Sequence, residues 1–414
     1  SITSGGGAVL DPITQEDPTL DLNFADSKAL RDDVDSDNPV TFTRASSATY
    51  VDSDGIIQSA TVNTPRFDHD PVTGESLGLL IEEARTNVIT YSEEFADAAW
   101  EKSAVTITPN AITAPDGTLT ASRVTNTADQ TTLKQSISVT GTCTASAYAK
   151  YDGNTDWFRF ATGAGAPSAW FNVNSGYVGI ETNCTGNIES VGNGWYRASI
   201  TGDFTPSTTL FLPPTSADGS GVEGNGNSLY IWGVQVEEGS SPTSYIPTVA
   251  STVTRAPDIA HINGANFSSF YNASEWTMYS EARCETGFTC SIHNNDDSKR
   301  YGLVIRVNDV ASSKFFQRTL NAGGGTGDIF ANPSTDVSGF VKSACTIGSS
   351  ANLYSDGLAG TVVDAFEYNA LAAVELAIGY RGSYLNDSFA NGHIKRLAYF
   401  PVRLPDDTLQ NITS

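Results

Sequence analysis

The chain has 414 residues, of which 39% are hydrophobic and only 17% charged, and its formal net charge is −24. A surface this acidic repels phosphate backbones and anionic bilayers, which excludes nucleic acid as an expected partner and membrane insertion as an expected role. The length predicts two or three domains at about 150 residues each. Abundant Gly, Ser, Thr, Asn and Asp favour short strands joined by turns over long helices.

Residues 1–84 are expected to form an N-terminal arm followed by a small β region. The run Ser4–Gly7 is too rich in glycine to pack a core, so it predicts a flexible arm that becomes ordered on a neighbouring subunit. Leu20–Phe24 alternates like a strand, Val40–Val51 is a Thr-rich β stretch, and Leu77–Ile81 is apolar throughout. These segments predict strands but do not indicate which strands pair.

Residues 85–249 are expected to form a jelly-roll sandwich of short strands between Gly- and Asn-rich turns. Two of its strands, Trp157–Phe160 and Trp170–Val173, alternate clearly between two kinds of side chain. Because neighbouring side chains point to opposite faces of a sheet, one face of each strand is predicted to be core and the other to be polar. The predicted core residues are Phe158, Phe160, Phe171 and Val173, and the predicted outer residues are Trp157, Arg159, Trp170 and Asn172.

Residues 250–414 are expected to form a second β-sandwich, so that the whole chain is all-β with tandem sandwiches. Trp276–Tyr279 opens a strand, Tyr301–Val307 is a more buried strand, and Ile394–Phe400 is the closing strand. After it, Pro405 or Asp406 is expected to start one short terminal helix, because proline is favoured at the beginning of helices.

A short echo links two distant parts of the chain. Phe42-Thr43-Arg44-Ala45 and Val253-Thr254-Arg255-Ala256 share three residue types in register. Four residues are too few to establish a repeat, so the echo is either a pair of equivalent strands in two sandwiches or a coincidence.

The chain has an odd number of cysteines and no C-x-x-C pair, which argues against a zinc or redox site. Pairing of Cys143 with Cys184 and of Cys284 with Cys290 stays open. We expect free thiols, mostly buried, made in a reducing cytosol. The five are Cys143, Cys184, Cys284, Cys290 and Cys345.

Several blocks resemble those of bacteriophage tail and virion-associated proteins. They are Phe42–Tyr50, Pro65–Asp70, Gly78–Asn87, Tyr91–Phe95 with Trp100, Gln235–Gly239 and Thr243–Thr248. Asn391–Leu397, with Leu404-Pro405, is similar to a stretch of lectin-type sandwiches. The resemblance covers most of the chain from about residue 40 onward. It implies a carbohydrate-binding-module-like jelly roll in the centre and a laminin-G-like or concanavalin-like lectin sandwich at the C-terminal end. The likeness to lectins does not by itself establish sugar binding.

Within that resemblance two roles stay open. The first is a tail fibre or spike that adheres to glycans of the host surface, and the second is a capsid decoration or head-fibre protein that mainly binds other virion proteins. Either role implies virion partners, a homo-oligomer that we expect to be a trimer, and host-surface polysaccharide as a further partner of the first. No secretory signal opens the sequence. We therefore expect a virion protein that is made in the host cytoplasm and released by lysis.

We expect no enzymatic activity. A glycan hydrolase needs a pair of carboxylates about 5 to 10 Å apart, and nothing in the sequence singles out such a pair. The four histidines form no H-E-x-x-H array, and no G-x-S-x-G elbow is present to activate a serine.

A weak calcium hypothesis attaches to one acidic turn. Asp68, Asp70 and Glu75 carry oxygens that Ca²⁺ prefers, with Thr73 nearby, but their spacing does not match an EF-hand loop. A turn stabilised by Asp side chains is the preferred interpretation. No other cofactor is expected.

The outer residues of the two central strands are the candidate glycan site. Trp157 and Trp170 offer flat apolar faces to a sugar ring, while Arg159 and Asn172 offer hydrogen bonds to its hydroxyls. The same residue types are enriched in protein cores and subunit interfaces, and that role is the more common one. If the chain binds glycans, however, these four residues are predicted to form the site.

Overall fold

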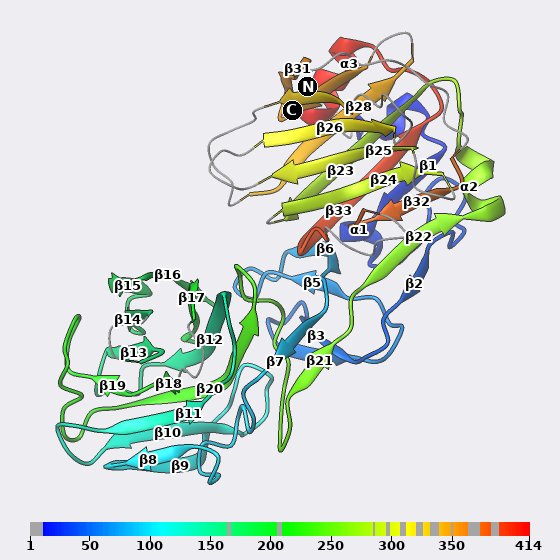
Figure 1. Cartoon of the computed structure of the whole chain (residues 1–414). Helices are drawn as coiled ribbons and strands as arrows, with labels where there is room; N and C mark the ends of the chain where they lie inside the picture. Colours follow the sequence, from blue (N-terminus) through cyan, green and yellow to red (C-terminus); the bar gives the residue numbers. More distant parts are fainter. Residues whose placement is uncertain are drawn as a thin grey trace, which may run out of the picture.

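The computed structural model describes residues 11–163, 167–204, 209–284, 286–294, 299–306, 312–319, 326–331, 339–348, 351–362, 373–381 and 389–414. Over these residues the chain is almost entirely β, in two lobes of strands that a narrow region connects (Figure 1). The predicted all-β fold of tandem sandwiches is confirmed. Among the helices of these residues, none combines the length and apolar character that a membrane span requires. The arm at Ser4–Gly7 lies outside the described residues.

One lobe, the central sandwich, consists of two sheets that enclose a shared core. The first sheet has the order β16-β17-β12-β20-β10-β9, with β9 Val105–Ile112, β10 Ala121–Asn126, β12 Thr142–Lys150, β16 Cys184–Ser190, β17 Trp195–Asp203 and β20 Ser228–Glu238. The second has the order β15-β14-β13-β18-β11-β8, with β8 Glu101–Ser103, β11 Thr132–Ser136, β13 Trp157–Ala161, β14 Ser168–Asn172, β15 Tyr177–Thr182 and β18 Thr209–Phe211. The short β19, Pro214–Thr215, pairs with β13.

The core of the central sandwich follows from two-residue alternation. Phe158 and Phe160 of β13 and Phe171 of β14 are fully buried, and the rings of Phe158 and Phe171 stack with centroids 5.4 Å apart. Val173, just beyond β14, is also buried. Each such side chain contributes about 1.5 to 3 kcal/mol on burial, which fixes the face that these strands turn inward.

The other lobe, the terminal sandwich, is built from two larger sheets. In the first, β30-β29-β28-β23-β33-β6-β5, with β1 also on β33, the strands are β1 Leu20–Asn23, β5 Phe67–His69, β6 Ser76–Ile81, β23 Trp276–Cys284, β28 Val341–Ile347, β29 Asn352–Ser355, β30 Leu358–Ala359 and β33 Gly392–Phe400. In the second, β2-β22-β32-β24-β25-β26-β27-β31, they are β2 Thr41–Thr43, β22 Ile259–Asn263, β24 Thr286–His293, β25 Lys299–Arg306, β26 Ser312–Thr319, β27 Thr326–Ala331, β31 Thr361–Val362 and β32 Glu375–Ile378.

Short helices close the terminal sandwich. They are η1 Thr14–Glu16, α1 Phe24–Ser27, α2 Gly264–Phe270 and α3 Asp406–Thr413. The predicted terminal helix is α3: Pro405 precedes it with an extended backbone, and Leu409 and Ile412 are buried in a small cluster with side chains of β23, β28 and β33.

The N-terminal strands β1, β2 and β6 pair with strands from the C-terminal part of the chain, and only β3 and β4 form a ribbon apart from it, so residues 1–84 do not make up one separate β region. Leu22 of β1 lies opposite Leu397, Leu79 of β6 lies opposite Ile394, and β2 pairs with β22. The physical reason is that apolar edge strands are satisfied by any partner with unpaired backbone groups, and the long β33 offers them. Alternation in the sequence indicates a strand but not its neighbour.

Two small ribbons lie between the lobes, and we call them the junction. One pairs β3 Ala48–Val51 with β4 Ile57–Ala60, and the other pairs β7 Arg85–Asn87 with β21 Val253–Arg255. Both passages of the chain between the lobes therefore lie in this narrow region (Figure 1).

No disulfide bond joins any of the five cysteines, which all lie within the described residues, and all but Cys184 are buried. Burial raises the pKa of Cys143 to about 11 and that of Cys290 to about 12. Because the thiolate is the reactive form, these two thiols are unreactive at neutral pH.

Candidate functional site

The predicted register of the two central strands is confirmed. β13 and β14 pair antiparallel with Trp157 opposite Asn172 and Arg159 opposite Trp170. Residues directly opposite in such a pair point to the same face, so all four predicted site residues lie on the outer face of the sheet, away from the phenylalanine core. Trp157, Arg159 and Asn172 are partly exposed there.

A third strand extends this face with an aromatic residue that the sequence analysis missed. Tyr177 of β15 lies opposite Asn172, and its side chain is 60% exposed. The rings of Trp157 and Tyr177 meet edge to face, with centroids 6.3 Å apart and planes at 90°. We call Trp157, Asn172 and Tyr177 the aromatic row. The signal for Tyr177 was the Asn-Ser-Gly turn before it, which predicts a hairpin.

Trp170 is not exposed, which corrects the expectation that both tryptophans of this face contact solvent. Only 7% of Trp170 is accessible, and its indole N–H donates to the carbonyl oxygen of Ser220 at 3.2 Å. The guanidinium of Arg159 lies 4.8 Å from the centre of its ring. Trp170 is therefore buried outside the main core, between Arg159 and the segment 216–224, which covers it.

Arg159 shares this covered position. Burial lowers the pKa of its guanidinium, and the nearby carboxylate of Glu223 acts in the opposite direction. Its Nε is buried without a hydrogen-bond partner among the described residues. Of the four predicted residues, Trp157 and Asn172 thus remain available to a ligand, whereas Trp170 and Arg159 serve mainly to support the face.

The covering segment 216–224 adds apolar surface next to the aromatic row. Asp218 anchors it by accepting a hydrogen bond from the backbone N–H of Ile180 at 2.7 Å. Ile180 is 53% exposed and Val222 is 46% exposed.

The aromatic row also offers a polar group. The Asn172 side-chain oxygen accepts from the backbone N–H groups of Asn174 and Ser175 at 3.0 and 2.9 Å. This assigns the oxygen to the turn, and the side-chain NH₂ makes no hydrogen bond to any described residue. The row therefore combines two aromatic faces with a fixed donor, which is the chemistry that a sugar ring with hydroxyl groups matches.

The three calcium candidates are engaged by protein donors. Asp68 accepts from the backbone N–H of Val51 at 2.5 Å and bonds to His393 Nε2 at 2.7 Å. Glu75 pairs with Lys395 at 2.7 Å. Asp70 accepts two backbone N–H groups within its own turn. Within the described ranges, no three His, Cys, Asp or Glu side chains meet in a way that could hold a metal ion.

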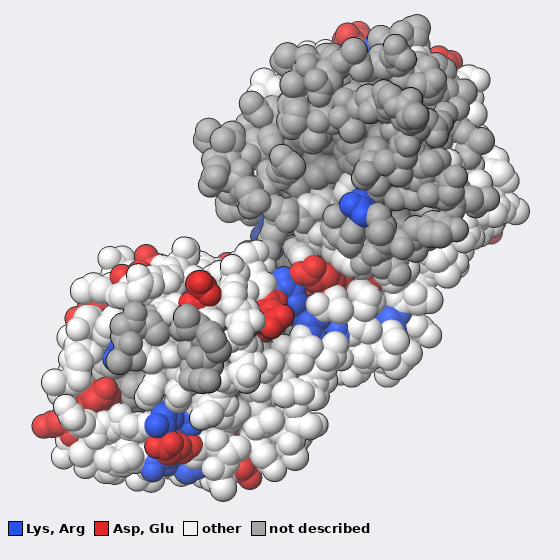
Figure 2. Space-filling model, viewed as in Figure 1, with Lys and Arg blue, Asp and Glu red and all other residues white. Residues whose placement is uncertain are grey.

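Many of the motif residues meet in a buried network at the junction. Asp258 accepts from Arg44 at 3.0 Å and from Arg66 at 2.5 Å, and Glu82 accepts from Arg66 at 2.8 Å and from Arg255. Acidic and basic side chains also meet on the surface where the lobes join (Figure 2). We call Arg44, Arg66, Glu82, Arg255 and Asp258 the junction network. Both arginines of the echo, Arg44 and Arg255, contribute to this network.

Glu82 is fully charged in this network. Its burial alone would raise the pKa of the carboxyl group, but the guanidinium groups of Arg255 and Arg66 outweigh that effect and hold the pKa well below its usual range. The side chain and backbone N–H of Ser244 donate two further bonds, each at 2.7 Å. Residues from three distant segments are thus locked together.

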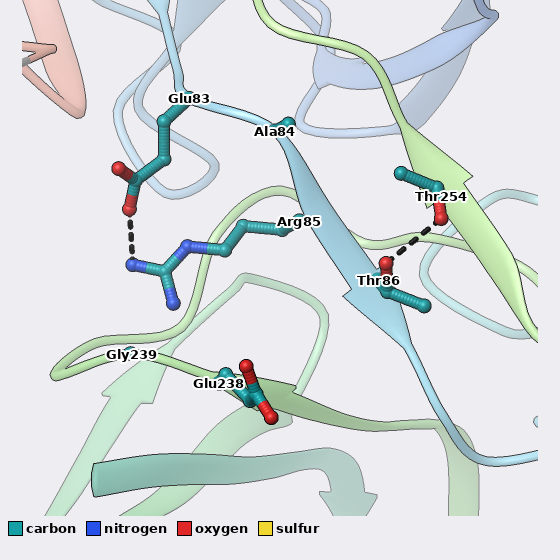
Figure 3. Close-up of a pocket in the computed structure, with 7 residues that line it drawn as sticks. All are labelled: Glu83, Ala84, Arg85, Thr86, Glu238, Gly239 and Thr254. Carbon is teal, nitrogen blue, oxygen red and sulfur yellow. Dashed lines mark hydrogen bonds and ion pairs between the residues drawn. The ribbon is translucent and has the colours of Figure 1, made fainter. Parts of the chain in front are cut away.

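A pocket of about 400 Å³ lies beside the junction (Figure 3). Arg85 pairs with Glu83 at 2.5 Å, and the hydroxyl groups of Thr86 and Thr254 bond at 2.8 Å. Gly239 has a φ of +134°, and a Cβ atom at this residue would lie 1.4 Å from Arg85 Nη1. The side chain of Arg85 therefore packs directly on the Gly239 backbone, which places the Arg-Thr and Glu-Gly blocks of the motifs in contact.

Comparisons with known proteins add little to this geometry. No protein-family model and no curated protein matches the chain. Among solved structures, the chain is similar to the CBM40 of Ruminococcus gnavus IT-sialidase bound to α2,3-sialyllactose, at 15% identity and TM-score 0.29 over 36% of this chain and 88% of that one. It is also similar to domains LG4-5 of the mouse laminin α1 chain, at 10% identity and TM-score 0.23 over 78% and 90%.

A third similar structure is Trypanosoma rangeli sialidase in complex with sialic acid, at 9% identity and TM-score 0.28 over 71% of this chain and 60% of that one. All three likenesses are weak. The fold class of this chain therefore rests on its own strands and their pairing.

Proposed function

We propose that this chain is a non-enzymatic structural protein of a bacteriophage particle that binds glycans of the host surface, as a tail fibre or spike. The sequence blocks that resemble virion-associated proteins support the particle assignment. Two rigid sandwiches joined by a buried network support a structural role, because such a body presents a surface at a fixed orientation.

The observation that carries the glycan-binding part is the aromatic row. Trp157, Asn172 and Tyr177 lie side by side across three paired strands, with Tyr177 60% exposed. Exposed aromatic side chains on a rigid sheet provide large apolar contact area at little entropic cost. Asn172 lies on the strand between those of Trp157 and Tyr177, and its unengaged NH₂ can donate to a hydroxyl group.

A glycan array of bacterial surface polysaccharides tests this function. Tyr177→Ala and Trp157→Ala are each expected to lower the affinity for the tightest-binding polysaccharide at least tenfold, which corresponds to about 1.4 kcal/mol. Leu119→Ala is a matched control, because Leu119 is also 60% exposed but does not belong to the row. It is expected to bind like the unmodified chain.

Unchanged binding in both row variants would refute the assignment of the site. If the same two variants instead leave glycan binding intact and dissociate the oligomer or release the protein from the particle, the row is a protein interface. The capsid decoration or head-fibre role would then replace the adhesion role.

We also propose that binding occurs without catalysis. The sequence contains no motif that would activate a nucleophile, and two of its thiols have raised pKa values. Incubation with the bound polysaccharide is expected to release no reducing ends over time. If reducing ends are released over time, and if substitution of a single carboxylate residue abolishes this release, this part of the proposal is overturned.

For the assembly we propose a homotrimer with other virion proteins as neighbours. Closed symmetry is the rule for homo-oligomers, and the glycine-rich arm suits interchain packing. Sedimentation of the full chain at micromolar concentration is expected to give the molecular mass of three chains. A stable monomer under these conditions would refute the trimer.

A further inference from the structure

We infer that the cleft between the two sandwiches is a second binding site, for a neutral, hydroxyl-rich ligand of one or two sugar units. The cleft has a volume of about 650 Å³ and is lined from both lobes. Ligand sites occur preferentially between domains, in clefts of about 300 to 1,000 Å³. This site is separate from the aromatic row and does not depend on the function proposed for it.

The wall on the central sandwich presents acceptor oxygens beside a guanidinium group. The Asn187 side-chain NH₂ donates to Glu189 Oε1 at 2.8 Å, which holds the two side chains together. Asn187 and Glu189 lie two residues apart on β16, so their side chains point to the same side, and both are exposed. Glu189 lies directly opposite Arg197 of the neighbouring β17. All three line the cleft. A hydroxyl group both donates and accepts, so it can bond to a carboxylate and a guanidinium at the same time.

Arg197 is held in place before any ligand arrives. Its Nη2 donates to the Ser146 hydroxyl at 3.1 Å and to the carbonyl oxygen of Thr243 at 2.7 Å. Its guanidinium also lies 5.4 Å from the centre of the Tyr148 ring. Nη1 makes no hydrogen bond to any described residue, so its two N–H groups are available to a ligand. Such preorganisation lowers the entropic cost of binding.

The opposite wall balances the charges. Asp70 and Arg283 line the cleft from the terminal sandwich, and the carboxylate of Asp68 is engaged by His393 at 2.7 Å. An anionic ligand near Arg197 and Arg283 would also meet the carboxylates of Asp70 and Glu189. A neutral ligand avoids this repulsion and uses both kinds of group. This charge pattern favours a neutral sugar over an acidic one.

The lobes touch at a point that sets the width of the cleft. Gly192, in the turn between β16 and β17, has a φ of +81°, and a Cβ atom there would lie 2.7 Å from the carbonyl oxygen of Pro71. Val191 and Pro71 flank this contact in the lining of the cleft. Together with the junction network, it holds the two walls at a fixed separation.

Saturation-transfer NMR with maltose, lactose and sucrose tests the inference on the full chain. At least one of the three is expected to bind with a Kd of about 1 mM or tighter. Asn187→Trp fills the cleft from an exposed position and is expected to weaken binding at least tenfold. Thr185→Trp is the matched control: Thr185 is exposed on the same side of β16 but does not line the cleft, so binding is expected to be unchanged.

Two further variants separate the sites and the causes. Trp157→Ala is expected to leave disaccharide binding unchanged, because the aromatic row lies elsewhere. Arg197→Gln is expected to weaken disaccharide binding at least tenfold. The melting temperature of this variant shows whether its fold persists. Absence of binding by all three sugars, equal binding in Asn187→Trp, or tighter binding of digalacturonate or Ca²⁺ than of any neutral sugar would overturn the inference.

Discussion

The junction network gathers charged side chains and the aromatic row gathers aromatic ones, and the two clusters differ in exposure. The side chains of Arg44, Arg66 and Asp258 have no solvent-accessible surface. In the row, by contrast, Tyr177 is 60% exposed and Trp157 is partly exposed. The charged groups of the first set are paired with one another within the chain, and the second set keeps exposed groups that a ligand can reach.

The difference separates the residues that stabilise the molecule from the residues that are exposed to a partner. Three of the five residues of the junction network, Arg44, Arg66 and Glu82, lie in the sequence blocks Phe42–Tyr50, Pro65–Asp70 and Gly78–Asn87, and they act in holding the lobes together. The row comes from strands outside those blocks. In this chain these blocks therefore contribute to stability, while the exposed aromatic surface is carried by residues outside them.

Breaking the junction network is expected to cause the largest loss in the free energy of unfolding. Asp258→Ala leaves the buried guanidinium groups of Arg44 and Arg66 without their shared carboxylate. Removing one partner of a buried ion pair typically costs about 3 to 5 kcal/mol. Denaturant unfolding measures this loss. Asp33→Ala, at the exposed pair with Arg31, is the control and is expected to cost less than about 1 kcal/mol. Similar losses in both variants would contradict a structural role for the network.

Acid is expected to weaken the same network. The folded-state pKa of Glu82 lies below its usual value of 4.5, so its contribution is fully present above about pH 4.5 and is lost as pH falls toward the folded-state value. Each such group changes stability by at most about 1.4 kcal/mol per pH unit. Melting temperatures between pH 7 and pH 3 measure this loss. Glu82→Gln should show a smaller change across that range; an identical pH profile would count against the assignment.

Disrupting the contact between Gly239 and Arg85 is expected to lower the free energy of unfolding less than Asp258→Ala does. Gly239→Ala places a methyl group in the space of the Arg85 guanidinium and strains a positive φ. Overpacking of this kind costs about 1 to 3 kcal/mol. Gly221→Ala is the control, because nothing lies within 4 Å of its added Cβ. Equal unfolding free energies for the two variants would show that Arg85 moves aside freely.

Substitution in the aromatic row is expected to change stability least. Tyr177→Ala removes an exposed side chain, and such changes usually stay within about 0.5 kcal/mol. Its free energy of unfolding should match that of the unmodified chain. A loss comparable to that of Asp258→Ala would mean that Tyr177 is part of the packed structure.

The sequence predicted features that depend on local alternation and missed those that depend on distant partners. The inward faces of Phe158 and Phe171 follow from the two-residue period of strands. Burial of Trp170 does not, since the carbonyl group that covers it belongs to Ser220, 50 residues away. Likewise, the sequence did not predict that Arg44 and Arg255 join one network, because Arg44 meets its partner Asp258 across 214 positions.

Hydrogen exchange with and without the tightest-binding polysaccharide tests the central claim most directly. The claim is that the outer face of the central sandwich binds the glycan while the junction network only holds the lobes together. Bound polysaccharide is expected to slow amide exchange in the segments Trp157–Ala161, Ser168–Asn172 and Tyr177–Thr182. Unchanged exchange in all three segments, while the protein is saturated with polysaccharide, would contradict the claim.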